Sequence, residues 1–211
     1  PVVITKGDIA RAFDNLEHPI VDDSLAAKGV PHCLRAAFLR ELVGVLLSTQ
    51  HQDAVVPDVE LGKGGKQGAT ETPFTWNCTL DHVVAPTVLS WKDRGLGLDL
   101  GDEMDKNLSH GVWADDFLIF STGLSETKLM LQELTDALAL GKLSWKPGSL
   151  SFLANDAALR SLDPEECKGL TILDASGSPV FVPRVESMTV LGIMADSKGS
   201  TSSALEHRLT A

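Results

Sequence analysis

The sequence has 211 residues, of which 43% are hydrophobic and 22% are charged, proportions typical of a globular protein rather than a disordered one. This length is sufficient for one compact domain, or a domain with an appendage, around a sizeable core. The formal net charge of −11 argues against a surface that binds nucleic acid along its whole extent, because such surfaces are basic. Either the basic surfaces belong to parts of the protein outside this sequence, or the chain does not bind nucleic acid.

The sequence carries no sign of a targeting signal or a membrane span. It begins at Pro1 and opens within a strand-like segment, so we expect a fragment without a secretory signal peptide. No run of 18 apolar residues is present, and no membrane span is expected. The three cysteines, Cys33, Cys78 and Cys167, are odd in number and lack metal-site spacing, which predicts thiols in a reducing, intracellular compartment. The choice between nucleus and cytoplasm stays open.

The N-terminal part predicts one strand and two helices. Apolar and β-branched residues over 2–9 are typical of a buried strand. A short helix is expected over 20–28, because Gly29 and Pro31 interrupt it. An amphipathic helix is expected to follow and to run to about Ser48, from apolar residues at spacings of four, four and three: Leu34, Phe38, Leu42 and Val45.

The middle of the sequence predicts an edge strand and a helix. The segment 54–61 contains Pro57, which a sheet tolerates only at its edge. Thr72 and Pro73 form an N-cap and first-turn pair for a helix. This helix is expected to end or kink near Pro86, whose ring removes a backbone donor.

The remainder predicts strands around one further helix. Residues 95–100 and 112–120 are strand candidates, and a helix over 125–140 should end at Gly141 as its C′ glycine. A last helix is expected from about Ser203. Four more short strands are expected between turns, at 150–153, 170–173, 180–182 and 188–194. This order predicts an α+β fold, with a small and mostly antiparallel sheet backed by helices.

Acidic residues interrupt two of the apolar strands. Asp8 stands where the first strand ends, at the rim of the sheet. Asp115 and Asp116 are adjacent within an apolar run, and consecutive strand residues point to opposite faces, so we expect a β-hairpin with residues 114–116 at its tip. Alternatively, an isolated Asp-Asp pair can be two solvated residues of a turn without a functional role. The apolar residues on both sides of Asp115 and Asp116 argue against this alternative.

The cost of placing these carboxylates in an apolar frame predicts a bound cation. A buried charge without a partner is expensive, and a divalent metal ion is an economical counter-charge. Mg²⁺ prefers carboxylate oxygens and usually takes one or two from a protein. Asp8 and Asp115 are therefore the candidate ligands.

These acids lie in segments that resemble the motifs of reverse transcriptases. Five segments resemble the family's motifs in its order and roughly its spacing: GDIARAFD at 7–14, GKQG at 65–68 followed by Pro73 and Asn77, WADD at 113–116, LGKLSWK at 140–146 and VLGI at 190–193. The likeness extends over about residues 2–211. The AFD form of the first motif and the spacing before the last resemble the non-LTR retrotransposon type.

The resemblance implies the palm domain of an RNA-directed DNA polymerase, as a fragment truncated at both ends over residues 1–211, with fingers and thumb largely absent. It implies RNA-templated DNA synthesis by two-metal nucleotidyl transfer, as part of a retrotransposon polymerase. The implied cofactor is Mg²⁺, as two ions, with Mn²⁺ as an alternative. The implied partners are an RNA template, a DNA primer and deoxynucleoside triphosphates, with no membrane and an unspecified oligomeric state. If fingers and thumb made most of the contacts to the template, the basic surfaces would lie there, which would also explain the negative net charge of this chain.

The family's metal ligands map onto Asp8, Asp115 and the main-chain carbonyl of Ile9. Asp116 is then the third family acid, closer to the primer terminus than to the metal ions. Lys146 is a candidate to protonate the pyrophosphate, with a solvated lysine as the alternative.

The resemblance also implies a nucleotide-binding set. Phe13 would lie under the sugar and exclude a 2′-hydroxyl, with a core phenylalanine as the alternative. Gln67 would contact the incoming nucleotide, beside Lys66, and Gly68 would allow its backbone to approach.

Two positions depart from the family pattern. Trp113 replaces the usual Tyr or Phe, and Glu71 brings a carboxylate near the expected triphosphate path. One alternative is therefore a catalytically inactive retrotransposon-derived remnant or a nucleic-acid-binding module with the same fold. Another is an unrelated acidic metal hydrolase with one of three histidines as its base: His18, His82 or His110.

Overall fold

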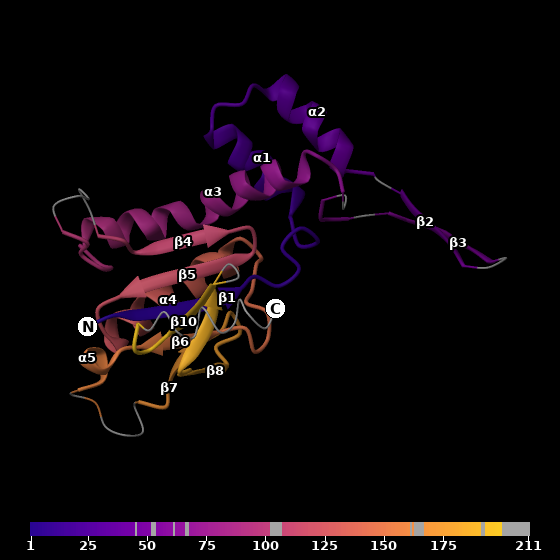
Figure 1. Cartoon of the computed structure of the whole chain (residues 1–211). Helices are drawn as coiled ribbons and strands as arrows, with labels where there is room; N and C mark the ends of the chain where they lie inside the picture. The colour runs from indigo at the N-terminus through magenta and orange to yellow at the C-terminus, as the bar shows by residue number, and fades with distance from the viewer. Residues whose placement is uncertain are drawn as a thin grey trace. The chain divides into compact units, whose positions relative to one another are not determined.

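The structure is a computed structural model that describes residues 1–44, 46–51, 54–60, 62–65, 68–101, 107–160, 162, 167–190 and 193–199. The chain divides into two compact units. The sheet unit consists of Pro1–Ala10, Pro86–Ala139 and Ser144–Ala211, and the helical unit of Arg11–Ala85 and Leu140–Leu143. Figure 1 shows the elements of both.

A four-stranded antiparallel sheet organises the sheet unit. Its strand order is β4-β5-β1-β6, with bounds β1 Val3–Asp8, β4 His110–Trp113, β5 Asp116–Ser121 and β6 Ser151–Ala154. The predicted strand over 2–9 is confirmed, and it lies between β5 and β6 (Figure 1). Buried residues alternate with partly exposed ones along β1 and β5, as expected for a sheet with one face in the core.

The helix α4, Leu124–Leu140, lies behind the sheet (Figure 1). It buries an apolar stripe completely, at Met130, Leu131, Leu134 and Leu138. Each fully buried side chain of this kind contributes about 1.5–3 kcal/mol relative to an exposed one. The predicted helix is confirmed, but its expected C′ glycine is not the left-handed residue: Lys142, with φ of 57°, takes that conformation instead of Gly141.

The helix α3, Thr72–Asp93, begins in the helical unit and ends in the sheet unit. The helix was expected to end or kink near Pro86, and an end there is wrong, because α3 continues to Asp93. Pro86 is exposed, so water can satisfy the carbonyl that loses its partner. Beyond the proline, Trp91 is fully buried and its Nε1 donates to Glu133 Oε2 of α4 at 2.8 Å, which anchors the last turns.

The smaller elements of the sheet unit are a short helix and two hairpins. The helix is α5, Asp156–Leu159, and the hairpins are β7 Gly169–Leu173 with β8 Pro179–Pro183, and β9 Ser187–Val190 with β10 Ile193–Asp196. The strands over 150–153, 170–173 and 180–182 are confirmed. The single strand expected over 188–194 is two strands. The helix expected from Ser203 lies outside the described residues.

The strand expected over 95–100 is wrong. This segment makes one isolated bridge, Leu98 with Leu108. Gly97 has φ of 110°, and a Cβ there would lie 2.5 Å from the main-chain oxygen of Leu108. A left-handed glycine packed against another backbone interrupts regular pairing.

The helical unit contains the N-terminal part of α3, two further helices and a hairpin. Their bounds are α1 His18–Ala27, α2 His32–Leu42, β2 Leu46–His51 and β3 Ala54–Glu60. The helix predicted over 20–28 is confirmed, whereas α2 ends well before the expected Ser48. Val43 is extended and Gly44 has φ of 73°, so the chain turns out of the helix there. The strand predicted at 54–61 is confirmed, and β3 is an edge because its sheet has two strands.

The predicted α+β fold with small, mostly antiparallel sheets is therefore confirmed. In the part of the chain that the structure describes, no helix has both the length and the apolar character needed to cross a membrane.

Candidate active site

The β4–β5 hairpin carries the paired acids at its tip. Trp113 is paired with Asp116, so Ala114 and Asp115 form the turn and Asp116 begins β5. Ala114 has φ of 54°, a left-handed conformation that is strained for a residue with a side chain. Such strain is concentrated at functional sites. The predicted hairpin is confirmed, with Asp116 just inside its second strand.

The adjacent strand brings Asp8 to the same place. Asp8 pairs with Asp116 in register, and Ile9 N donates to the main-chain oxygen of Asp115 at 2.9 Å. This pattern makes Asp8 and Asp116 a non-hydrogen-bonded pair, in which cross-strand side chains are closest. The end of β1 and the hairpin tip thus gather all three predicted acids.

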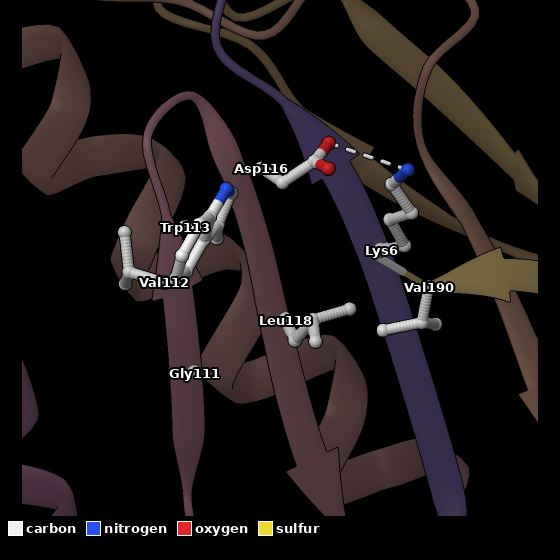
Figure 2. A pocket seen from close by; sticks show the side chains of 7 residues that line it. All are labelled: Lys6, Gly111, Val112, Trp113, Asp116, Leu118 and Val190. Carbon is white, nitrogen blue, oxygen red and sulfur yellow. Dashed lines mark ion pairs between the residues drawn. The ribbon is translucent and has the colours of Figure 1, made fainter. Parts of the chain in front are cut away.

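Two lysines flank these carboxylates. Lys6 Nζ lies 3.2 Å from Asp116 Oδ1 and 3.8 Å from Asp8 Oδ1, and Lys146 Nζ lies 4.0 Å from Asp8 Oδ2. Figure 2 shows Lys6 reaching from β1 toward Asp116 on β5. Lys6 and Asp8 share a face because they are two residues apart on one strand. That spacing could have identified Lys6 from the sequence.

The Asp8 carboxyl is the least well satisfied group of the site. Burial raises its pKa, and the adjacent Asp116 carboxyl raises it further, while Lys6 and Lys146 act in the opposite direction. Asp8 Oδ1 is buried and accepts no hydrogen bond from the residues that the structure describes. An oxygen in this condition favours a cation as its partner.

The donor set fits a hard divalent cation. Within the described part of the chain, no three His, Cys, Asp or Glu side chains are grouped as they would be around a metal ion. The site instead offers a small number of carboxylates, which is what Mg²⁺ usually takes from a protein before water and phosphate complete its shell. Asp8, which is half-buried, and Asp115, which is exposed, are the two carboxylates that the sequence predicts as ligands.

A pocket of about 150 Å³ lies beside Asp116 on the same face of the sheet. Seven residues line it: Lys6, Gly111, Val112, Trp113, Asp116, Leu118 and Val190 (Figure 2). Trp113 is 68% exposed, so its ring forms an open wall beside the acids rather than part of the core.

The helical unit holds a second, open pocket, of about 450 Å³, that includes two of the predicted nucleotide-binding residues. Phe13 and Gly68 both line it, with Ala69, Thr72 and Pro73. Phe13 is half-buried and packs edge-on against Trp76, with ring centroids 5.9 Å apart. Gly68 has φ of 85°, and a Cβ there would meet nothing within 4 Å. The predicted Lys66 and Gln67 lie outside the described residues.

Two of the three histidines of the hydrolase hypothesis, His18 and His110, have contacts elsewhere in the fold. His18 Nε2 lies 3.0 Å from the main-chain oxygen of Gly64. The His110 ring stacks on that of Phe117, with ring centroids 5.9 Å apart, and burial lowers the pKa of His110. These contacts are structural and give the hydrolase hypothesis no support.

Comparison with solved structures shows the same fold in telomerases. The chain is similar to telomerase from Candida albicans in complex with a TWJ fragment of telomeric RNA, with a TM-score of 0.63 and 9% identity over 92% of this chain and 29% of that one. It is also similar to apo telomerase from Candida tropicalis truncated from its C-terminal domain, with a TM-score of 0.54 and 11% identity over 93% and 34%. The chain thus spans about a third of the length of these proteins. The likeness confirms the palm-type fold.

Sequence comparison identifies the family. No curated protein sequence matches the chain. The family model described as reverse transcriptase (RNA-dependent DNA polymerase) matches residues 2–193, which is most of the chain. The protein therefore belongs to the reverse transcriptase (RNA-dependent DNA polymerase) family.

Proposed function

We propose that this chain forms the catalytic palm of an RNA-directed DNA polymerase, which extends a DNA primer with deoxynucleotides copied from an RNA template. The observation that carries the proposal is the convergence of Asp8, Asp115 and Asp116 at one end of the sheet, with a buried Asp8 oxygen that lacks a hydrogen-bond donor in the described structure. Membership of the family supports the same reaction.

In this proposal the carboxylates of Asp8 and Asp115 and the main-chain carbonyl of Ile9 would hold the metal ions. When bound there, two Mg²⁺ ions, or Mn²⁺ in their place, would supply positive charge to a 3′-hydroxyl and to a departing pyrophosphate. Asp116 acts nearer the primer terminus. Its ion pair with Lys6 offsets the repulsion between Asp116 and Asp8, which would otherwise disfavour two ionised carboxylates on adjacent strands.

We assign nucleotide selection to Phe13, Lys66, Gln67 and Gly68. The pocket shared by Phe13 and Gly68 supports this, because it combines an aromatic wall with a backbone that carries no side chain. A ring at position 13 would exclude a ribose 2′-hydroxyl by size. Lys146, which is exposed and lies 4.0 Å from Asp8, is the proposed proton donor to pyrophosphate.

We further propose that residues 1–211 form one palm domain of the non-LTR retrotransposon type. The AFD sequence at 12–14 supports this assignment. Because the chain has a net charge of −11, it is poorly suited to bind the phosphates of a template, and in this proposal most template contacts come from other parts of the polymerase. Sequencing the gene on both sides of this segment tests the assignment, which predicts coding sequence for fingers, thumb and an endonuclease.

An inactive remnant is the second candidate. It is favoured by two features, the exposed Trp113 where the family has Tyr or Phe, and Glu71 near the expected triphosphate path. It keeps the same arrangement of carboxylates but synthesises no DNA.

Primer extension on an RNA template with the full-length protein distinguishes these candidates. Wild type should extend the primer with deoxynucleotides, and Asp8→Asn and Asp115→Asn should each reduce the rate by at least about a hundredfold, since each removes a metal ligand. Asp136→Asn, an exposed acid on α4, is the matched control and should be active. A folded wild-type protein that adds no nucleotide would support the remnant.

A further inference from the structure

A turn beside β1 holds the backbone of Asp8. Residues 146–149 form a β-turn in which Ser149 N donates to the main-chain oxygen of Lys146 at 3.0 Å. Pro147 occupies the second position, and Gly148, with φ of 75°, occupies the third. This combination is a type II turn, which a Pro-Gly sequence strongly favours.

The main-chain N–H and C=O of Asp8 point toward this turn. Asp8 and Asp116 form a non-hydrogen-bonded pair, so the Asp8 backbone groups are directed away from β5. On the opposite side β6 pairs with β1 only as far as Lys6, which lies opposite Ser151. Continued in the same register, the strand would place Ser149 opposite Asp8, but the chain has already turned there.

The Ser149 side chain takes the place of the missing strand partner. Asp8 N donates to Ser149 Oγ at 3.0 Å, and the same hydroxyl donates to the main-chain oxygen of Asp8 at 3.2 Å. Lys146 N donates to that oxygen as well, at 2.8 Å. A hydroxyl can accept and donate at once, so one side chain satisfies both backbone groups of Asp8.

We propose that Ser149 is a positioning residue for Asp8, an inference that rests on the proposed function of Asp8 as a metal ligand. Its hydroxyl lets the chain leave the sheet at residue 149 without breaking the hydrogen bonding of Asp8. The turn that this permits also brings Lys146 Nζ to 4.0 Å from Asp8 Oδ2. One short segment thus fixes the backbone of the ligand and sets the charge beside its carboxylate.

Ser149→Ala removes both hydroxyl bonds and leaves Asp8 N–H without that acceptor. The carboxylate then samples more orientations, and groups that orient a metal ligand typically change metal affinity by about 10–100-fold when they are removed. Ser149→Thr keeps the hydroxyl and should restore binding. Ser151→Ala is the matched control, because Ser151 is a nearby serine of β6 opposite Lys6 rather than Asp8.

The test is Mn²⁺ binding to the full-length protein, measured by the electron paramagnetic resonance signal of free Mn²⁺. Ser149→Ala should weaken binding about 10–100-fold, while Ser149→Thr and Ser151→Ala stay near wild type. In primer extension the loss should fall on kcat, with KM for the nucleotide little changed. Wild-type affinity in Ser149→Ala, or failure of Ser149→Thr to restore it, would overturn the proposal.

Two further variants keep the outcome unambiguous. If Ser149→Ala does not fold, Ser149→Cys replaces it, because a thiol is a weak donor and acceptor and should weaken Mn²⁺ binding relative to Ser149→Thr. Asp8→Asn should abolish the binding altogether. If Asp8→Asn binds Mn²⁺ as wild type does, the proposed metal site is wrong; if only Ser149→Ala does, the role of Ser149 alone is wrong.

Discussion

Gly7, which immediately precedes Asp8, provides the most quantitative test of how the site is packed. A Cβ at this position would lie 2.6 Å from Leu150 Cδ2 and 2.9 Å from Cε3 and Cζ3 of Trp145. The Trp145 ring is restrained, because its Nε1 donates to Thr135 Oγ1 at 2.9 Å and the ring packs in a T-shaped arrangement with that of Phe117, with ring centroids 6.4 Å apart. Gly7→Ala should therefore strain the sheet next to the metal ligand.

The expected magnitude follows from two opposing effects. Overpacking of a core typically costs about 1–3 kcal/mol. Replacing glycine by alanine returns about 0.4–1 kcal/mol, since it reduces the conformational entropy of the unfolded chain. The difference between these ranges is a net loss of up to about 2.6 kcal/mol, or about 1.3 kcal/mol at their midpoints. The midpoint value lowers the melting temperature of a protein of this size by about 3–5 °C.

The assay is thermal unfolding followed by circular dichroism, with Gly111→Ala as control. Gly111 belongs to the same sheet, but a Cβ there would meet Phe120 Cε2 at 3.7 Å and Leu118 Cδ1 at 3.9 Å, which are ordinary contacts. Gly111→Ala should leave the melting temperature unchanged or raise it. Equal melting temperatures for the two variants would refute the packing around Gly7 described above.

Three further predictions concern single side chains. Pro86→Ala should raise the free energy of unfolding by about 1–3 kcal/mol, because α3 continues past this exposed proline and alanine adds a backbone hydrogen bond. Urea titration measures this change, and a lower free energy of unfolding in the variant would contradict the continuous helix. Burial lowers the pKa of His110, so the unfolded chain binds more protons, and the free energy of unfolding should fall as the pH drops below about 6.5. His110→Phe should weaken this pH dependence, as measured by urea titrations at several pH values. An unchanged pH dependence in His110→Phe would show that His110 is not its source. Lys6→Met should raise the pKa of Asp8 further, because one of the two cations that lower this pKa is lost. Carbon NMR of the Asp8 carboxyl group measures the change, and an unchanged pKa would show that Lys6 does not act on Asp8.

The sheet of the candidate site could be predicted from the sequence because its signals are local. Apolar alternation defines β1 and β5, and adjacent acids in a strand require a turn between them. The motifs around Asp8 and Asp115 add the family resemblance. Together they predicted the hairpin with residues 114–116 at its tip, and they named Asp8 and Asp115 as ligands of the same metal ions.

Element ends and supporting contacts depended on tertiary structure and could not be predicted in this way. The apolar spacing from Leu34 to Val45 predicted a helix that continues past Gly44, whereas the chain turns out of α2 there. Burial of Trp91 carries α3 beyond Pro86, against the local preference of proline. Ser149 is linked to Asp8 across 141 residues of sequence, through a register that only the folded sheet reveals.

The central claim is that Asp8 and Asp115 hold the divalent metal ions of a polymerase. Its most direct test is a crystal structure of the full-length protein with RNA template, non-extendable DNA primer, deoxynucleoside triphosphate and Mn²⁺, in which anomalous scattering locates the metal. The account predicts anomalous peaks within coordination distance of carboxylate oxygens of both Asp8 and Asp115. Fully bound nucleotide with no Mn²⁺ at Asp8, or with Mn²⁺ bound only elsewhere, would contradict it.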